Sequence, residues 1–209
     1  DGIRRMTELS EVLKVNMQGI IQAADKMGTV QGSIESSAKL QMLGGRFAMN
    51  FSDPMRAMYQ SQSDPEALFK TIVDSVKGMS TFDKENGMAT TNWQGRQMLK
   101  AAAEASGANY DDLLQASQSQ AKLQFMGSMM NPNLTEDEKL SVANRAQRGS
   151  NGQYYVDYYN DATGKHEQKN INSLTSSDVK NMTARAEQEK DLNGNVQKIT
   201  DFLGKDIKD

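Results

Sequence analysis

The sequence contains no cysteine, only three prolines and a single tryptophan in 209 residues. Without cysteine, the chain can form no disulfide, no thiolate metal site and no cysteine nucleophile. Positive charge is not in excess either, since 24 basic residues stand against 27 acidic ones and the formal net charge is −3. Because the basic residues are spread along the chain, nucleic-acid binding through charge is disfavoured. No apolar run reaches the roughly eighteen residues of a membrane-spanning helix, so we predict no stable membrane span.

Motifs that carry catalytic or ligand-binding chemistry are missing as well. His166 is the only histidine, so it has no second histidine with which to bind zinc, and we expect it to lie exposed on a strand. Thr163-Gly164-Lys165 ends like a phosphate loop, but Tyr159 stands where the first glycine should be. In Asp191–Asn195 the glycine comes too early for an EF-hand. We therefore predict no catalytic residue, no metal and no cofactor, and expect a protein that is not an enzyme.

The composition indicates a helical protein with a lean core. Apolar residues make up 37% of the chain, and the mean hydropathy is −0.70. Fourteen methionines against six phenylalanines favour adaptable, irregular packing. We predict a mainly α fold, either a helical bundle or a string of helices, with one β-hairpin near residues 153–171. The hairpin follows from a tyrosine-rich run, a turn rich in Asn, Asp and Gly, and a second polar run.

The first fifty residues carry apolar side chains at seven-residue steps. The series is Met6, Leu13, Ile20, Met27 and Ile34. Such a heptad pattern predicts an apolar seam on a helix, either inside a larger bundle or in a coil of identical chains. Glycine is unfavourable in a helix interior, so a break near Gly28 is also predicted.

A corner between helices is predicted from the next stretch, Leu40 to Val76. Gly44 and Gly45 remove side chains where the backbone must turn or come close to another segment. Two Asp-Pro steps follow, Asp53-Pro54 and Asp64-Pro65, eleven residues apart. The aspartate accepts from free N–H groups and the proline lacks an N–H where none is needed, so a helix should begin at each step.

Further helices follow along the chain. The pattern predicts a helix pair at 95–106 and 111–130, with Gly107 as the stop of the first and Asn109 as the cap of the second. The pair resembles a helix-turn-helix, but the second helix begins Asp111-Asp112, which would repel phosphate. Residues 79–92 read as a connection. Thr135 and Thr175, each followed three residues later by an acidic residue, predict two more helix starts.

These elements divide the sequence into three stretches. Residues 1–50 form a long helical segment with the seam, 51–132 a region of short capped helices, and 133–209 a helix, hairpin and helix region. The chain opens on Asp1 without a methionine, and we expect it to be a fragment of a longer protein.

The run Leu40-Gln41-Met42-Leu43-Gly44-Gly45-Arg46-Phe47-Ala48, with Asp-Pro-Glu-Ala-Leu-Phe at 64–69, resembles a known family. It is similar to the tape-measure-like or packaged internal proteins of crass-like tailed bacteriophages, over most of residues 38–182. The resemblance implies a structural or cargo protein of the virion. Such a protein is held in the tail or capsid lumen, contacts tail, portal or capsid subunits, and passes into the host at infection. Two alternatives remain open: a DNA-associated protein using the helix pair 95–127, and a fragment of a cell-wall hydrolase with an unrecognised motif.

Overall fold

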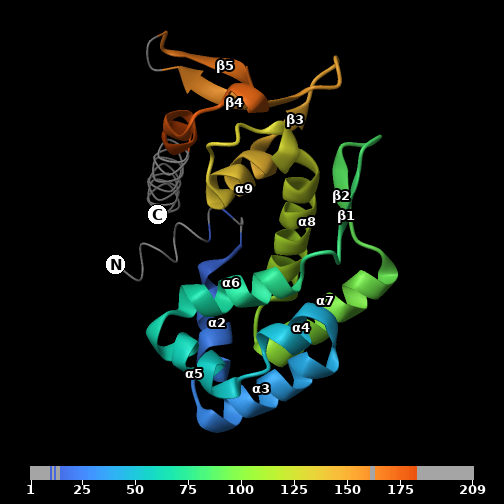
Figure 1. Ribbon diagram of the computed structural model, residues 1–209, viewed down its shortest axis with the longest axis vertical. Coiled ribbons are helices and arrows are strands. Elements are labelled where there is room, and N and C mark those ends of the chain that lie inside the picture. The colour runs from blue at the N-terminus through green and yellow to red at the C-terminus, as the bar shows by residue number, and fades with distance from the viewer. Residues whose placement is uncertain (1–9, 11, 13–14, 161–162, 183–209) are drawn as a thin grey trace, which may run out of the picture. The chain divides into compact units, whose positions relative to one another are not determined.

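The computed structural model describes residues 10, 12, 15–160 and 163–182, and these residues are mainly helical (Figure 1). The predicted fold class is therefore confirmed. The helices are α2 (Met17–Met27), α3 (Val30–Met42), α4 (Gly45–Asn50), α5 (Pro54–Ser63), α6 (Pro65–Ser75), α7 (Trp93–Ser106), α8 (Tyr110–Met126) and α9 (Glu136–Arg145), with short 3-10 turns at η1 (Gly127–Met129) and η2 (Ile171–Ser173). The strands are β1 (Thr81–Asp83), β2 (Met88–Thr90), β3 (Gln147–Arg148), β4 (Tyr154–Asn160) and β5 (Lys165–Asn170).

The described residues form two compact units. The helical unit runs up to Met129 and takes in Thr135–Arg145, so it holds α2 to α9 and the β1–β2 hairpin. The sheet unit consists of Met130–Leu134 and the described residues from Ala146 to Met182, with β3, β4 and β5. The three stretches 1–50, 51–132 and 133–209 describe the sequence, and that division stays a prediction.

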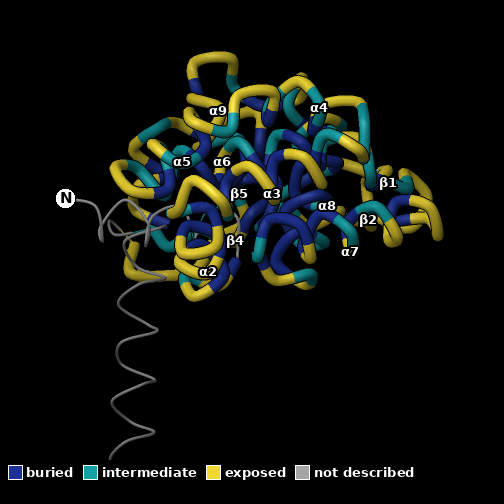
Figure 2. Tube along the Cα trace, turned by 90° about the horizontal axis from the view of Figure 1, so that it is seen from below, coloured by how far each residue is buried: buried dark blue, intermediate teal, exposed yellow. Residues whose placement is uncertain are grey.

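The core of the helical unit is built from side chains of nearly all its helices. Its largest fully buried members include Phe47, Phe51, Phe69, Ile20 and Leu113. Buried and exposed positions alternate along these helices, as an amphipathic pattern requires (Figure 2). Residues from both the N-terminal stretch and the helix pair thus share one core.

The seven-residue seam enters this core only in part. Ile20 and Met27 are fully buried, whereas Ile34 is 48% exposed. The reason is the predicted break: α2 ends at Met27 with Gly28 as its cap, and α3 starts anew with the Thr29 hydroxyl accepting from the Gly32 N–H. Because α3 starts anew, its buried face does not continue the heptad pattern and consists of Ser33, Ser36, Ser37 and Leu40. Met6 and Leu13 lie outside the described residues.

The corner and both Asp-Pro helix starts are confirmed. Gly44 (φ 74°) and Gly45 (φ 55°) both adopt a positive φ between α3 and α4. Asp53 Oδ1 accepts from the N–H groups of Met55 and Arg56, and Asp64 Oδ1 accepts from that of Ala67. Pro54 and Pro65 occupy the first turns of α5 and α6. The chain therefore turns and restarts three times within thirty residues of the sequence.

The connection predicted at 79–92 is instead a second hairpin, β1–β2. Its strands pair antiparallel from Thr81↔Thr90 to Asp83↔Met88. Asp83 Oδ1 accepts from the N–H groups of Glu85 and Asn86, and Gly87 closes the turn with φ 66°. The hairpin is anchored by Phe82, whose ring stacks on Phe125 of α8 with centroids 4.6 Å apart. Strands this short depend on that tertiary contact and leave a weak pattern in the sequence.

The stop of the first helix and the cap of the second are confirmed, whereas α7 begins two residues before the predicted start and α8 ends at Met126 instead of 130, followed by the 3-10 turn η1. Gly107 ends α7 with φ 83°, and the Asn109 side chain accepts from the Asp111 N–H at the start of α8. Thr135 and Glu138 form the predicted capping box of α9, with bonds of 3.2 and 2.9 Å.

The sheet unit contains the predicted tyrosine-rich hairpin, extended by one short strand. The strand order is β3-β4-β5, and β4 pairs antiparallel with β5 from Tyr155↔Asn170 to Asn160↔Lys165. Residues 176–182 are helical, opened by the predicted pair Thr175 and Asp178. The apolar side chains that this unit buries among its described residues are Met130, Leu134, Tyr154, Val156, Ile171, Leu174, Val179 and Met182. The helix predicted around 196–202 lies outside the described residues.

Candidate functional site

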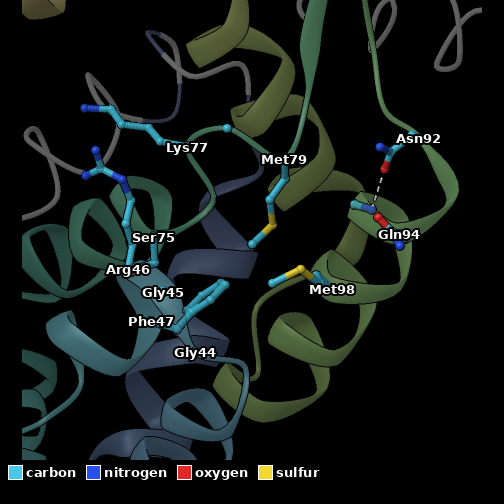
Figure 3. Close-up of a pocket in the computed structure, with 12 residues that line it drawn as sticks. Gly44, Gly45, Arg46, Phe47, Ser75, Lys77, Met79, Asn92, Gln94 and Met98 are labelled. Atoms are coloured by element: carbon cyan, nitrogen blue, oxygen red, sulfur yellow. Dashed lines mark hydrogen bonds between the residues drawn. The ribbon is translucent and has the colours of Figure 1, made fainter.

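A pocket of about 330 Å³ opens at the glycine corner of the helical unit (Figure 3). It is formed by the start of α4, the end of α6 with the turn after it, and the first turns of α7. Its twelve lining residues are Gly44, Gly45, Arg46, Phe47, Ser75, Lys77, Gly78, Met79, Asn92, Gln94, Gly95 and Met98.

Glycine creates the open space in this pocket. At Gly44, Gly45 and Gly78, no heavy atom lies within 4 Å of the place where a Cβ would stand. The walls there are bare backbone, and all three glycines have positive φ. Gly95 has the opposite role: a Cβ on it would come closer than 3.0 Å to the Met79 carbonyl oxygen. Only glycine lets α7 approach the turn after α6 this closely.

The floor of the pocket is apolar and contains two thioethers. Figure 3 shows the Phe47 ring, Met79 and Met98 pointing toward one another in its centre. Phe47 is 1% exposed, whereas both methionines are half-buried. Methionine is flexible and polarizable, so this floor can adapt to the shape of an apolar group placed on it.

One edge of the pocket carries two cations that share a single carboxylate. Arg46 Nη1 lies 3.3 Å from Asp74 Oδ2, and Lys77 Nζ lies 3.0 Å from Asp74 Oδ1. Burial alone would raise the pKa of Asp74, but hydrogen bonds from Lys77 and Asn50 and the charges of Lys77 and Arg46 outweigh it and lower that pKa. The carboxylate therefore stays ionised, and the edge keeps one net positive charge.

Amide groups form the other side of the mouth. Asn92 Oδ1 accepts from the Gly95 N–H at 2.7 Å and so caps α7 (Figure 3). Gln94 follows two residues later and is exposed. The arrangement combines an apolar floor, a positive edge and an amide rim, features that ligand-binding pockets share, and none of the twelve lining residues is Asp, Glu, His or Cys.

A second pocket, of about 210 Å³, lies between α6, α8 and α9. One of its two lysines, Lys70, is paired with two carboxylates, since its Nζ lies 2.9 Å from Glu66 and 3.5 Å from Asp137. The other, Lys77, also lines the corner pocket. Within the part of the chain that the structure describes, no group of three or more His, Cys, Asp or Glu could hold a metal ion. The same part contains no helix long and apolar enough to cross a membrane.

Of the residues predicted to matter from the sequence, some line the corner pocket and others lie elsewhere in the structure. Gly44 and Gly45 line the corner pocket. Asp53, Pro54, Asp64 and Pro65 cap neighbouring helices and do not line it. His166 lies exposed on β5, as predicted, and its ring is edge-on to that of Tyr159. At the start of α8, Asp111 is exposed and Asp112 is buried.

Sequence reasoning missed Lys77, Met79, Gln94 and Met98 as members of the pocket. They come from two segments whose approach depends on tertiary packing. The one trace of them in the sequence is glycine, at Gly78 and at Gly95, where the predicted helix 95–106 begins.

Comparisons of the chain with models of protein families, with curated proteins and with solved structures found no match.

Proposed function

We propose that this chain is a non-enzymatic structural or ejected internal protein of a tailed-phage virion. In this proposal it is housed in the capsid or tail lumen, contacts tail, portal or capsid subunits and reaches the host during infection. The observation that carries the proposal is the run from Leu40 to Phe69, which resembles tape-measure-like and packaged internal proteins. In the fold this run is the glycine corner, the short helix α4 and the starts of two helices with side-chain caps, which supports a role in protein contacts.

Exposed apolar side chains on α3 and α5 support a role in protein contacts. The two helices pack against each other, since Ser33 Oγ donates to the Pro54 carbonyl oxygen and Gln62 Nε2 donates at 2.7 Å to that of Gly28, just before α3. Helical spacing puts two exposed apolar residues on one face of each helix. They are Val30 and Ile34 on α3 and Met55 and Tyr59 on α5, exposed by 53, 48, 44 and 69%. Apolar side chains exposed in this way suit contact with another protein.

Passage through a narrow tube also favours a chain that unfolds readily. The helical unit buries Ser33, Ser36 and Ser37, and larger apolar side chains at such positions would stabilise the folded state more. Its helices are short, ten to seventeen residues for all but α4, and begin at their own caps. Short capped helices can separate and reform without a disulfide to hold them.

Mass spectrometry of purified phage particles tests the proposal directly. The tryptic peptides of this chain should co-purify with the major capsid protein through a density gradient, at a constant ratio across the particle peak. A chain abundant in infected cells but absent from the gradient peak would overturn the virion assignment.

Two assays separate the alternative functions. DNA association through 95–127 predicts a salt-dependent electrophoretic shift of duplex DNA, weakened by Lys122→Gln and strengthened by Asp111→Asn. A cell-wall hydrolase predicts clearing in a peptidoglycan zymogram. We expect neither result.

A further inference from the structure

We propose that the corner pocket anchors a partner peptide by one large apolar side chain, with an acidic residue next to it. The proposal rests on that part of the proposed function which assigns contacts to other proteins, and it does not depend on where those contacts are made.

The size of the pocket points to a single side chain. Its 330 Å³ lies near the lower end of the range of about 300–1,000 Å³ for ligand sites. Met79 and Met98 present thioether surface to whatever enters, beside the buried ring of Phe47 (Figure 3). Sulfur–aromatic contacts favour an aromatic ring over a polar group in that place.

The charge of the edge points to an acidic neighbour. Arg46 and Lys77 lie along one side of the mouth, and their shared partner Asp74 neutralises only one of them. None of the twelve lining residues is acidic. A carboxylate on the residue beside the apolar anchor would meet the remaining positive charge, which is charge complementarity of the kind that orients a partner.

The amide rim fits a peptide backbone. Gln94 is exposed at the mouth and offers both a donor and an acceptor. An extended segment crossing the mouth could therefore place its apolar side chain on the floor, its acid at the cationic edge and its backbone beside Gln94.

Three blocked peptides test the two halves of this proposal on the free protein. The first, acetyl-Ala-Phe-Glu-amide, carries both anchors. The second replaces Glu by Gln and the third replaces Phe by Ser. Binding is followed through the methyl resonances of ¹³C-methyl-methionine protein, with Met79 and Met98 as reporters and Met49, which is 73% exposed on α4, as reference.

We expect the Phe-Glu peptide to shift Met79 and Met98 saturably, with a Kd of about 1 mM for so small a probe. The Gln peptide should bind about two- to fivefold more weakly, as for an exposed ion pair, and Lys77→Gln should erase that difference. The Ser peptide should give no saturable shift. Equal shifts from all three peptides, or an equal response at Met49, would overturn the proposal.

A matched pair of variants ties binding to the pocket. Gln94→Trp puts a large ring at the mouth, and Gln97→Trp puts the same ring on an exposed position of α7 that does not line the pocket. The first should weaken the Phe-Glu peptide at least about tenfold by filling the site, and the second should leave it unchanged. If Gln94→Trp bound like Gln97→Trp, the pocket would not be the site. Peptide binding without particle membership would overturn the virion role alone, and the reverse result would overturn the pocket alone.

Discussion

At the scale of single residues, the Asp112 carboxylate joins two helices that are distant in sequence. Its Oδ1 accepts from the Asn16 N–H at 2.9 Å, at the start of α2. Its Oδ2 lies where a side chain of residue 19 would stand, less than 3.0 Å from the position of a Cβ on Gly19. A side chain at position 19 would therefore collide with the Asp112 carboxylate, and glycine avoids that collision.

Gly19→Ala should destabilise the helical unit by about 1–3 kcal/mol, the usual cost of overpacking. Alanine is the better helix former, so a local effect would have the opposite sign. Urea unfolding measures the difference. Gly127→Ala is the control, because a Cβ there meets only Leu123 Cδ1 at an ordinary 3.6 Å. If Gly19→Ala lowered the free energy of unfolding no more than Gly127→Ala does, the contact with Asp112 would be contradicted.

The same carboxylate should make stability depend on pH. Burial raises the pKa of Asp112, the Asn16 N–H lowers it, and the charge of Asp111 raises it further, so that the folded state holds its proton more tightly than the unfolded chain does. The stabilisation is complete below the ordinary aspartate pKa of about 4 and is lost as the pH rises through the higher folded pKa. Unfolding free energies measured from about pH 4 to pH 7 should therefore fall more in the native chain than in Asp112→Asn. Parallel profiles would refute the effect.

Two buried serines of α3 should be dispensable for stability. The hydroxyls of Ser36 and Ser37 are buried without a hydrogen-bond partner in the described structure. Replacing either by alanine removes an unsatisfied polar group and should leave stability equal or raise it by up to about 1 kcal/mol. Ser106→Ala should instead cost about 1 kcal/mol, because the Ser106 hydroxyl donates to the Ala102 carbonyl oxygen and accepts from the Ala108 N–H. Losses at Ser36 and Ser37 as large as that at Ser106 would indicate hidden partners.

At the scale of elements, the corner between α3 and α4 depends on a backbone shape that only glycine adopts readily. Gly44 has φ 74° and ψ −168°, a region essentially closed to residues with a Cβ. No atom crowds the position, so the cost of a side chain there comes from the backbone itself. Gly44→Ala should cost about 1–3 kcal/mol. Met42→Ala, at an 85% exposed residue two positions earlier, should stay within about 0.5 kcal/mol of the native chain in the same urea titration.

The sequence predicts an element correctly where a side chain interacts with backbone groups close to it in the chain. Asp53, Asp64, Asn109 and Thr135 cap helices in the structure as their sequence context predicts, because a cap needs only groups two or three residues away. The hairpin β1–β2 was missed because its stability comes from Phe82 stacking on Phe125, forty-three residues further along. Ile34 was placed in the seam because a heptad pattern cannot show the change of helix phase at Thr29.

The candidate site was predictable only in its glycines. Gly44 and Gly45 were predicted to mark either a turn or a close approach; they form the turn, no atom approaches them closely, and they line the pocket. Met79 and Met98 complete its floor only after α7 has packed against the turn that follows α6, which is a long-range event with no local pattern.

At the scale of the whole molecule, the division into a helical unit and a sheet unit predicts two unfolding events. Each unit buries its own apolar side chains: Phe69 is fully buried in the first, and Val156 is 1% exposed in the second. Phe69→Ala should lower the melting temperature of one transition and Val156→Ala that of the other, through losses of about 3–5 and about 2 kcal/mol. Differential scanning calorimetry of the full chain resolves the two, and one transition shifted equally by both variants would mean a single cooperative unit.

The proposed passage through a tube makes a further prediction about the melting temperatures of the whole molecule. Both transitions should lie well below roughly 90 °C, the mark of hyperstable proteins, and a higher value would count against ejection in an unfolded form.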